Sequence, residues 1–103
     1  MPHPETVRVA VVQAGAAPFD TDAAVRKACS MTNQAASDGA ELVLLPEAYV
    51  GGYPWGLAFG TAVGGRSDAG RRTWERYWAG AVDVPGPETE RMGEAAAAAG
   101  VQL

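Results

Sequence analysis

A single carboxylate, Glu47, directly follows an apolar run that ends in a proline. Residues 42–46 read Leu-Val-Leu-Leu-Pro, and a loop rich in glycine and aromatic residues comes after Glu47. If the run is a buried strand of an open α/β sheet, Glu47 lies just beyond its carboxyl end, where such sheets build their active sites. Pro46 also fixes the direction in which the chain leaves the strand. An exposed glutamate after a strand is common and is the alternative interpretation. Pro46 and the glycine-rich, aromatic loop, which could build an apolar pocket around the carboxylate and raise its pKa, strengthen the case for Glu47 as a general base.

The chain holds one cysteine, one lysine and one histidine. Cys29 falls on the apolar face of an expected helix, where a free cysteine behaves as a small hydrophobe, so we interpret it as structural rather than nucleophilic. Lys27 lies on the same helix and is interpreted as a solvated surface residue. A lone His3 argues against a histidine-based triad and against a multi-histidine metal site.

The elements that must position Glu47 form a strand–helix–strand unit. Residues 7–13 are β-branched and mostly apolar, residues 22–37 have helical apolar spacing, and residues 41–45 form the second apolar run. Asp20 and Asp22 are better explained as helix caps than as a metal pair. Short connections predict parallel strands joined by a right-handed crossover. The expected buried helix face comprises Val25, Ala28, Cys29, Thr32, Ala35 and Ala36.

The second half of the chain begins with a long loop over 48–66 that contains six glycines. Its four aromatic residues argue against disorder and for a functional loop. Asp68 can cap a helix over 69–80, and Pro87 suits the first turn of a helix that runs through an alanine stretch to Ala99. Residues 101–103 look like the opening of a third strand. The fold class is α/β.

Composition limits the function classes. The chain has 103 residues and a net charge of −4, which disfavours nucleic acid because phosphate binding needs a basic face. The arginines between residues 66 and 76 are interrupted by acidic side chains and fit a solvated helix face. No apolar run approaches the ~20 residues of a membrane span, and no signal-peptide pattern opens the chain. We expect a cytoplasmic protein that binds neither nucleic acid nor membrane.

Several segments together resemble the nitrilase family of carbon–nitrogen hydrolases. Residues 9–13 resemble its first strand, and residues 36–46 resemble its first helix end and second strand. The most specific piece is Pro46-Glu47-Ala48 followed by Gly52-Tyr53-Pro54. Residues 76–78 and 82–87 (Val-Asp-Val-Pro-Gly-Pro) resemble true nitrilases more than the amidases of the same superfamily. The resemblance covers nearly the whole chain.

This resemblance implies an α-β-β-α sandwich and a Glu-Lys-Cys triad. Glu47 matches the general base, a cysteine thiolate would attack the nitrile carbon to form a thioimidate, and a lysine would stabilise the tetrahedral intermediates. Ammonia and a carboxylic acid would be released from a small-molecule nitrile without a metal or organic cofactor. Tyr53 matches an aromatic position that lines the substrate pocket, and Trp55 is a second candidate for substrate binding. Family members form homo-oligomers.

The lysine and cysteine of the family triad have no counterpart here, because Lys27 and Cys29 precede Glu47 and lie on a different element. We therefore expect residues 1–103 to be the incomplete N-terminal part of a carbon–nitrogen hydrolase domain, inactive alone. The alternatives are an amidase of the same superfamily and a non-catalytic fragment or interaction module. A flavodoxin-like binding domain is a weaker reading, because the first strand is not followed by an anion-binding glycine turn.

Overall fold

The structure is a computed structural model that describes residues 6–53, 61–62 and 65–103. Its first half is a βαβ unit, as the sequence predicts. Strand β1 (Val9–Val11) and strand β2 (Leu42–Leu44) flank helix α1 (Thr21–Ser37). The second half contains β3 (Thr61–Ala62), β4 (Gly65–Arg66), α2 (Asp68–Ala79) and α3 (Pro87–Ala99). The chain is therefore of mixed α/β class.

The sheet is parallel and has β2 at its centre. Val9 pairs with Leu42 and Val11 with Leu44. On the other side of β2, the Val43 amide donates to the Gln102 carbonyl at 2.8 Å, and Gln102 forms a parallel bridge to Leu42. The predicted opening of a third strand at 101–103 is thus confirmed as a bridge. Strands β1 and β2 are both shorter than predicted, because only three residues of each are paired with the other strand.

Helix α1 begins where the sequence offers a cap. The Asp20 carboxylate accepts a hydrogen bond from the Ala23 amide at 3.0 Å, which satisfies one of the free donors of the first turn. The buried face comprises Ala24, Val25, Ala28, Thr32 and Ala35. Two predicted members of that face, Cys29 and Ala36, are instead half-buried at its margin. The Thr32 hydroxyl donates to the Ala28 carbonyl and so remains satisfied inside the core.

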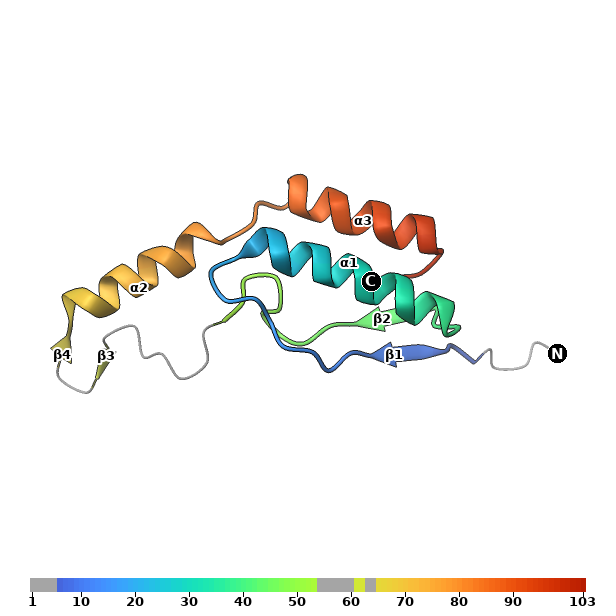
Figure 1. Cartoon of the computed structure of the whole chain (residues 1–103), viewed down its shortest axis with the longest axis horizontal. Coiled ribbons are helices and arrows are strands. Elements are labelled where there is room, and N and C mark those ends of the chain that lie inside the picture. Colours follow the sequence, from blue (N-terminus) through green and yellow to red (C-terminus); the bar gives the residue numbers. More distant parts are fainter. Residues whose placement is uncertain (1–5, 54–60, 63–64) are drawn as a thin grey trace.

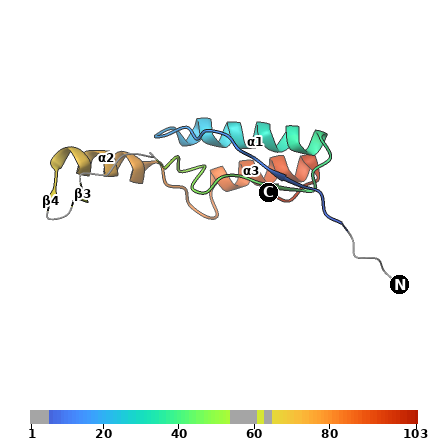
Figure 2. The ribbon, with the colours of Figure 1, turned by 90° about the horizontal axis from the view of Figure 1, so that it is seen from below.

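Helices α1 and α3 lie side by side and cover one face of the sheet (Figures 1 and 2). Ala35 of α1, Val43 of β2, Ala96 of α3 and Val101 form the buried cluster between them. One side of the alanine run of α3 therefore packs closely, with Ala96 buried, whereas Ala97 and Ala98 are exposed. Gly100 ends α3 in the left-handed conformation (φ 71°), which glycine adopts without a Cβ penalty.

The opposite face of the sheet is apolar and exposed. Side chains alternate across a strand, so the residues on either side of buried Val43 point away from the helices. We call Val9, Val11, Leu42 and Leu44 the outer sheet face; Val11 is 70% exposed and Leu44 is 57% exposed. Parallel sheets are normally covered on both faces. The outer sheet face therefore has the composition of an interior surface.

Helix α2 and the short strands project from one end of this unit (Figure 1). Ser67, not Asp68 as predicted, caps α2, and its side chain accepts from the Gly70 amide at 3.0 Å. The prediction of an unbroken loop over 48–66 was wrong in one respect, because β3 and β4 form an antiparallel pair within it. Among the described residues, no helix is both long enough and apolar enough to cross a membrane.

A charged cluster joins α1 to α3. Asp22 of α1 pairs with Arg26 one turn later and accepts a hydrogen bond from the Arg91 guanidinium of α3 at 2.7 Å. The Arg91 hydrogen bond, followed by the charge of Arg26, lowers the pKa of Asp22 below its ordinary value. The three side chains are largely exposed, so solvent and salt screen the pairs.

We expect Asp22→Asn to lower the melting temperature by no more than a few degrees at pH 7. A carboxyl whose pKa is lowered on folding stabilises the fold at every pH above its pKa in the unfolded chain, which is about 4 for Asp. This stabilisation is lost as the pH falls from there through the lower pKa of the folded state. The melting temperatures of the parent chain and the variant should therefore converge below about pH 4. Thermal unfolding followed by circular dichroism across pH checks this. A gap that persists at low pH would contradict it.

Candidate active site

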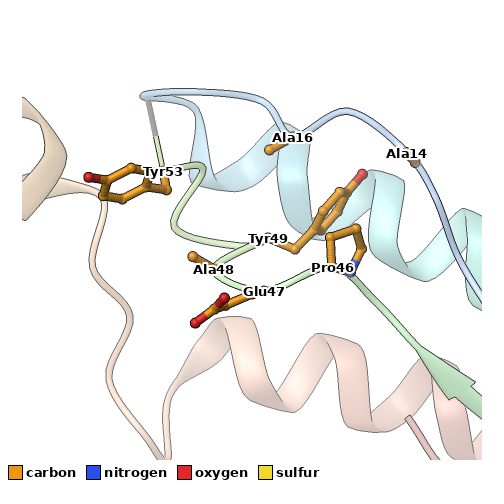
Figure 3. A pocket seen from close by; sticks show the side chains of 7 residues that line it. All are labelled: Ala14, Ala16, Pro46, Glu47, Ala48, Tyr49 and Tyr53. Atoms are coloured by element: carbon orange, nitrogen blue, oxygen red, sulfur yellow. The ribbon is translucent and has the colours of Figure 1, made fainter. Parts of the chain in front are cut away.

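Glu47 lies where the sequence predicts it, three residues beyond the carboxyl end of β2. It borders a pocket of about 450 Å³ whose other lining residues are nonpolar or aromatic (Figure 3). These are Ala14, Ala16, Pro46, Ala48, Tyr49 and Tyr53. The volume falls in the range of small-molecule sites, which usually combine apolar walls with a few polar groups. Glu47 itself is exposed, so it lies at the open rim of this pocket.

A tight turn carries Glu47 away from the sheet. The Ala48 carbonyl accepts from the amides of Gly52, at 3.0 Å, and Tyr53, at 3.4 Å. Ala48 has a φ of 54°, an uncommon left-handed conformation for a residue with a Cβ. Gly52 also has a positive φ, and a Cβ there would lie 2.8 Å from the Ala17 carbonyl oxygen. Glycine is therefore required where this turn meets the segment after β1.

The segment after β1 forms the wall opposite this turn. Ala14 and Ala16 line the pocket, although neither carries a reactive group, and sequence reasoning did not identify them. The Tyr49 hydroxyl donates to the Gly15 carbonyl at 3.1 Å. The Nζ of Lys27 donates to the same carbonyl at 2.6 Å, so the interpretation of Lys27 as simply solvated was incomplete. Tyr49 and Gly15 are 34 positions apart, so no local pattern in the sequence indicates their contact.

Tyr53 lines the pocket and stacks against α2. Its ring makes an edge-to-face contact with Tyr77 at a centroid distance of 5.7 Å, and the Tyr77 ring lies 5.8 Å from that of Trp74. Such pairs stabilise beyond the area they bury. Helix α2 thus backs the aromatic side of the pocket. The second candidate for substrate binding, Trp55, lies outside the described residues.

Cys29 is remote from this pocket in its contacts. Its Sγ lies 3.8 Å from the Arg91 carbonyl, between α1 and α3, which fits the structural interpretation.

The described residues contain no group of three or more histidine, cysteine or acidic side chains arranged to hold a metal ion. Glu47 is the one carboxylate among the described residues that line the pocket.

Cys29→Ala is expected to leave catalysis that depends on the Glu47 pocket within about two-fold of the parent rate, because the thiol contacts the α3 backbone rather than the pocket. Loss of one small, half-buried side chain should slightly lower the melting temperature. Steady-state turnover and thermal unfolding measure the two effects. A folded variant without activity would show that Cys29 takes part in the reaction.

Comparison with known proteins identifies the family of this chain. The family model described as carbon–nitrogen hydrolase matches residues 8–103. The chain is 49% identical over 98 residues to nitrilase 3 of Arabidopsis thaliana, covering 95% of this chain and 28% of that protein. It is 48% identical over 87 residues to the bifunctional nitrilase/nitrile hydratase NIT4B of Nicotiana tabacum, covering 84% of this chain and 25% of that protein.

A bacterial protein, the aliphatic nitrilase of Sinorhizobium fredii (strain HH103), is 44% identical over 96 residues, covering 93% of this chain and 31% of that protein. The chain therefore spans between 25% and 31% of the length of these three relatives. The matched region contains both β-strands of the parallel sheet and the whole Glu47 pocket. The chain belongs to the carbon–nitrogen hydrolase family.

Proposed function

We propose that this chain provides the general base and part of the substrate pocket of a nitrilase, which converts a nitrile and two water molecules into a carboxylic acid and ammonia. The observation that carries the proposal is Glu47 at the rim of a pocket with apolar walls, directly after the central strand. Identities of 44–49% to proteins named as nitrilases support this activity over others in the family.

In the proposed reaction, Glu47 takes the proton of a cysteine thiol as the sulfur bonds to the nitrile carbon, and the proton passes to the nitrile nitrogen. Glu47 then activates water against the thioimidate, so that ammonia leaves and a thioester remains. A second water releases the acid and restores the thiol. A lysine stabilises the tetrahedral intermediates. Tyr53 and Trp55 are proposed to contact the substrate.

The triad lysine and cysteine are proposed to come from the part of the domain that these 103 residues do not include. Cys29 contacts the α3 backbone, and Lys27 is bonded to the Gly15 carbonyl, so neither is proposed to act as the triad cysteine or lysine. The isolated chain is therefore proposed to be inactive. In a full-length chain, by which we mean these residues followed by the remaining part of the domain, Glu47 would meet its partners.

The outer sheet face supports an α-β-β-α sandwich in the full-length chain. Val9, Val11, Leu42 and Leu44 present an apolar surface on the side of the sheet opposite α1 and α3. Burial of each such side chain contributes roughly 1.5–3 kcal/mol when it is complete. We propose that the second sheet of the domain packs here and also encloses the exposed Glu47 carboxylate. Enclosure would raise the pKa of that carboxyl toward the range that suits a general base.

Ammonia release from a panel of nitriles and matching amides tests the proposal. The purified chain is assayed alone and mixed with a separately expressed C-terminal part of the domain. Activity toward nitriles in the mixture alone is the expected result. Activity confined to amides would identify an amidase of the same family. If neither sample is active while circular dichroism shows folded material, the chain is a non-catalytic module and the proposal is wrong.

A further inference from the structure

Two hydrogen-bond donors from different elements converge on the carbonyl of Gly15. The Tyr49 hydroxyl, from the turn after Glu47, lies 3.1 Å from that oxygen, and Lys27 Nζ, from α1, lies 2.6 Å from it. Figure 3 shows the Tyr49 ring reaching toward the segment that carries Ala14 and Ala16. Gly15 lies between these two lining residues. The shared carbonyl therefore ties one wall of the pocket to the turn that carries Glu47.

Hydrogen bonds rather than side-chain packing hold Gly15. A Cβ built on this glycine would meet nothing within 4 Å, and the residue is exposed. A carbonyl oxygen has two lone pairs and can accept both bonds at once. The bond from the ammonium group is charge-assisted and therefore the stronger type. Tyr49 is only 4% exposed, so its ring is fixed by packing and directs the hydroxyl at one place.

Tyr49 and Glu47 lie on either side of one constrained residue. Ala48 adopts its left-handed conformation between them, and its carbonyl closes the turn with Gly52 and Tyr53. In Figure 3 the Glu47 carboxylate and the Tyr49 ring extend in different directions from this backbone. Because only Ala48 separates the two residues, a shift of the Tyr49 backbone would also move the backbone of Glu47. Loss of the Tyr49 anchor would therefore move the turn that carries Glu47 relative to Ala14 and Ala16.

We propose that Tyr49 and Lys27 are positioning residues, which hold the Gly15 carbonyl and thereby fix the turn that carries Glu47 relative to the opposite wall of the pocket. In this role the Tyr49 hydroxyl and the Lys27 ammonium group act through the Gly15 carbonyl and not on the substrate. The kinetic part of the proposal rests on the proposed hydrolase function, whereas the anchoring part does not. Two experiments therefore separate a failure of the anchor from a failure of the functional assignment.

The first experiment measures the anchor by NMR in the chain and in three variants. Tyr49→Phe keeps the ring and removes the hydroxyl, and Lys27→Met keeps the stem and removes the ammonium group. Ser37→Ala is the matched control, because it removes a side-chain bond to the Asn33 carbonyl at the far end of α1. Each anchor variant should move the Gly15 carbonyl ¹³C resonance upfield, and the control should not. Unchanged resonances in both anchor variants would overturn the proposal.

The same samples, together with the Tyr49→Phe/Lys27→Met double variant, report the order of the pocket wall. Backbone order parameters for residues 14–16 should lie near the rigid value of about 0.85 in the parent chain, and should fall toward about 0.6 in the double variant. The Ser37→Ala control should keep the parent values. Order parameters that stay at the parent level in the double variant would show that other contacts fix the wall, and would contradict the proposal.

The second experiment measures kcat and KM for nitrile hydrolysis in the full-length chain. Because small misplacements of a reacting group are costly, Tyr49→Phe should lower kcat about 10-fold, and the double variant up to about 100-fold. KM should change by less than about two-fold, because Tyr49→Phe keeps the ring that lines the pocket and Lys27 is not one of the lining residues. Lys27→Arg should restore much of the activity lost in Lys27→Met. Parent-like kcat in a double variant that has lost the anchor would refute positioning.

A full-length parent without activity would count against the proposed function and not against the anchor. If the full-length parent hydrolyses no nitrile or amide, the proposed function fails, and the carbonyl resonance still decides whether the anchor exists. If the parent is active, the kcat of the anchor variants decides whether the anchor positions Glu47. The two failures are therefore distinguishable.

Discussion

Glu47→Gln in the full-length chain is expected to reduce kcat for nitrile hydrolysis by about 10²–10⁴-fold or more, with little change in KM. Glutamine has nearly the same size as glutamate and makes similar hydrogen bonds, but it cannot accept the proton of the attacking thiol or water. Glu47 is exposed at the pocket rim, so the substitution should leave the fold intact. Ammonia release measures the rate, and circular dichroism checks the fold.

Glu41→Gln is the matched control for this substitution. Glu41 directly precedes β2, at the opposite end from Glu47, and its carboxylate accepts from the Arg8 amide at 2.8 Å. A glutamine oxygen can still accept that bond, so the control should retain activity within about two-fold. Nitrile hydrolysis that survives Glu47→Gln would show that Glu47 is not the base. Equal losses in both variants would indicate a structural effect at the ends of β2.

The parallel unit could be predicted because its signals are local. Runs of β-branched and apolar residues identified both strands, helical apolar spacing identified α1, and Asp20 marked the helix start. The position of Glu47 beyond β2 followed from the same pattern. Strand ends were less predictable, since they depend on where the partner strand stops pairing. The β3–β4 pair was missed because strands of two residues leave no periodic pattern.

The surroundings of Glu47 could not be predicted, because contacts between distant residues make them. Ala14 and Ala16 have no chemical signature, and they form a pocket wall only because the segment after β1 passes beside the turn at Ala48. The contact of the Arg76 guanidinium, 4.1 Å above the Phe19 ring, joins α2 to the same segment. Such pairings depend on how the elements pack and not on neighbouring residue types.

Leu44→Lys should affect the stability of the isolated chain and of the full-length chain differently. The difference tests whether a second sheet covers the outer sheet face. Leu44 is 57% exposed here, so the substitution should barely change the melting temperature of the isolated chain. In the full-length chain the same ammonium group would be buried between two sheets. An unpaired buried charge costs several kcal/mol, a large part of the ~5–15 kcal/mol that stabilises a domain. The full-length variant should therefore lose most of its soluble, folded protein.

Ala98→Lys is the matched control for Leu44→Lys. Ala98 is exposed on α3, away from the buried cluster that joins α3 to the sheet, and lysine is a good helix former. It adds the same charge and should be tolerated in both contexts. Soluble yield and thermal unfolding of the four proteins measure the difference. If the full-length chain tolerates Leu44→Lys as well as Ala98→Lys, the outer sheet face remains in solvent, and the proposed sandwich is wrong.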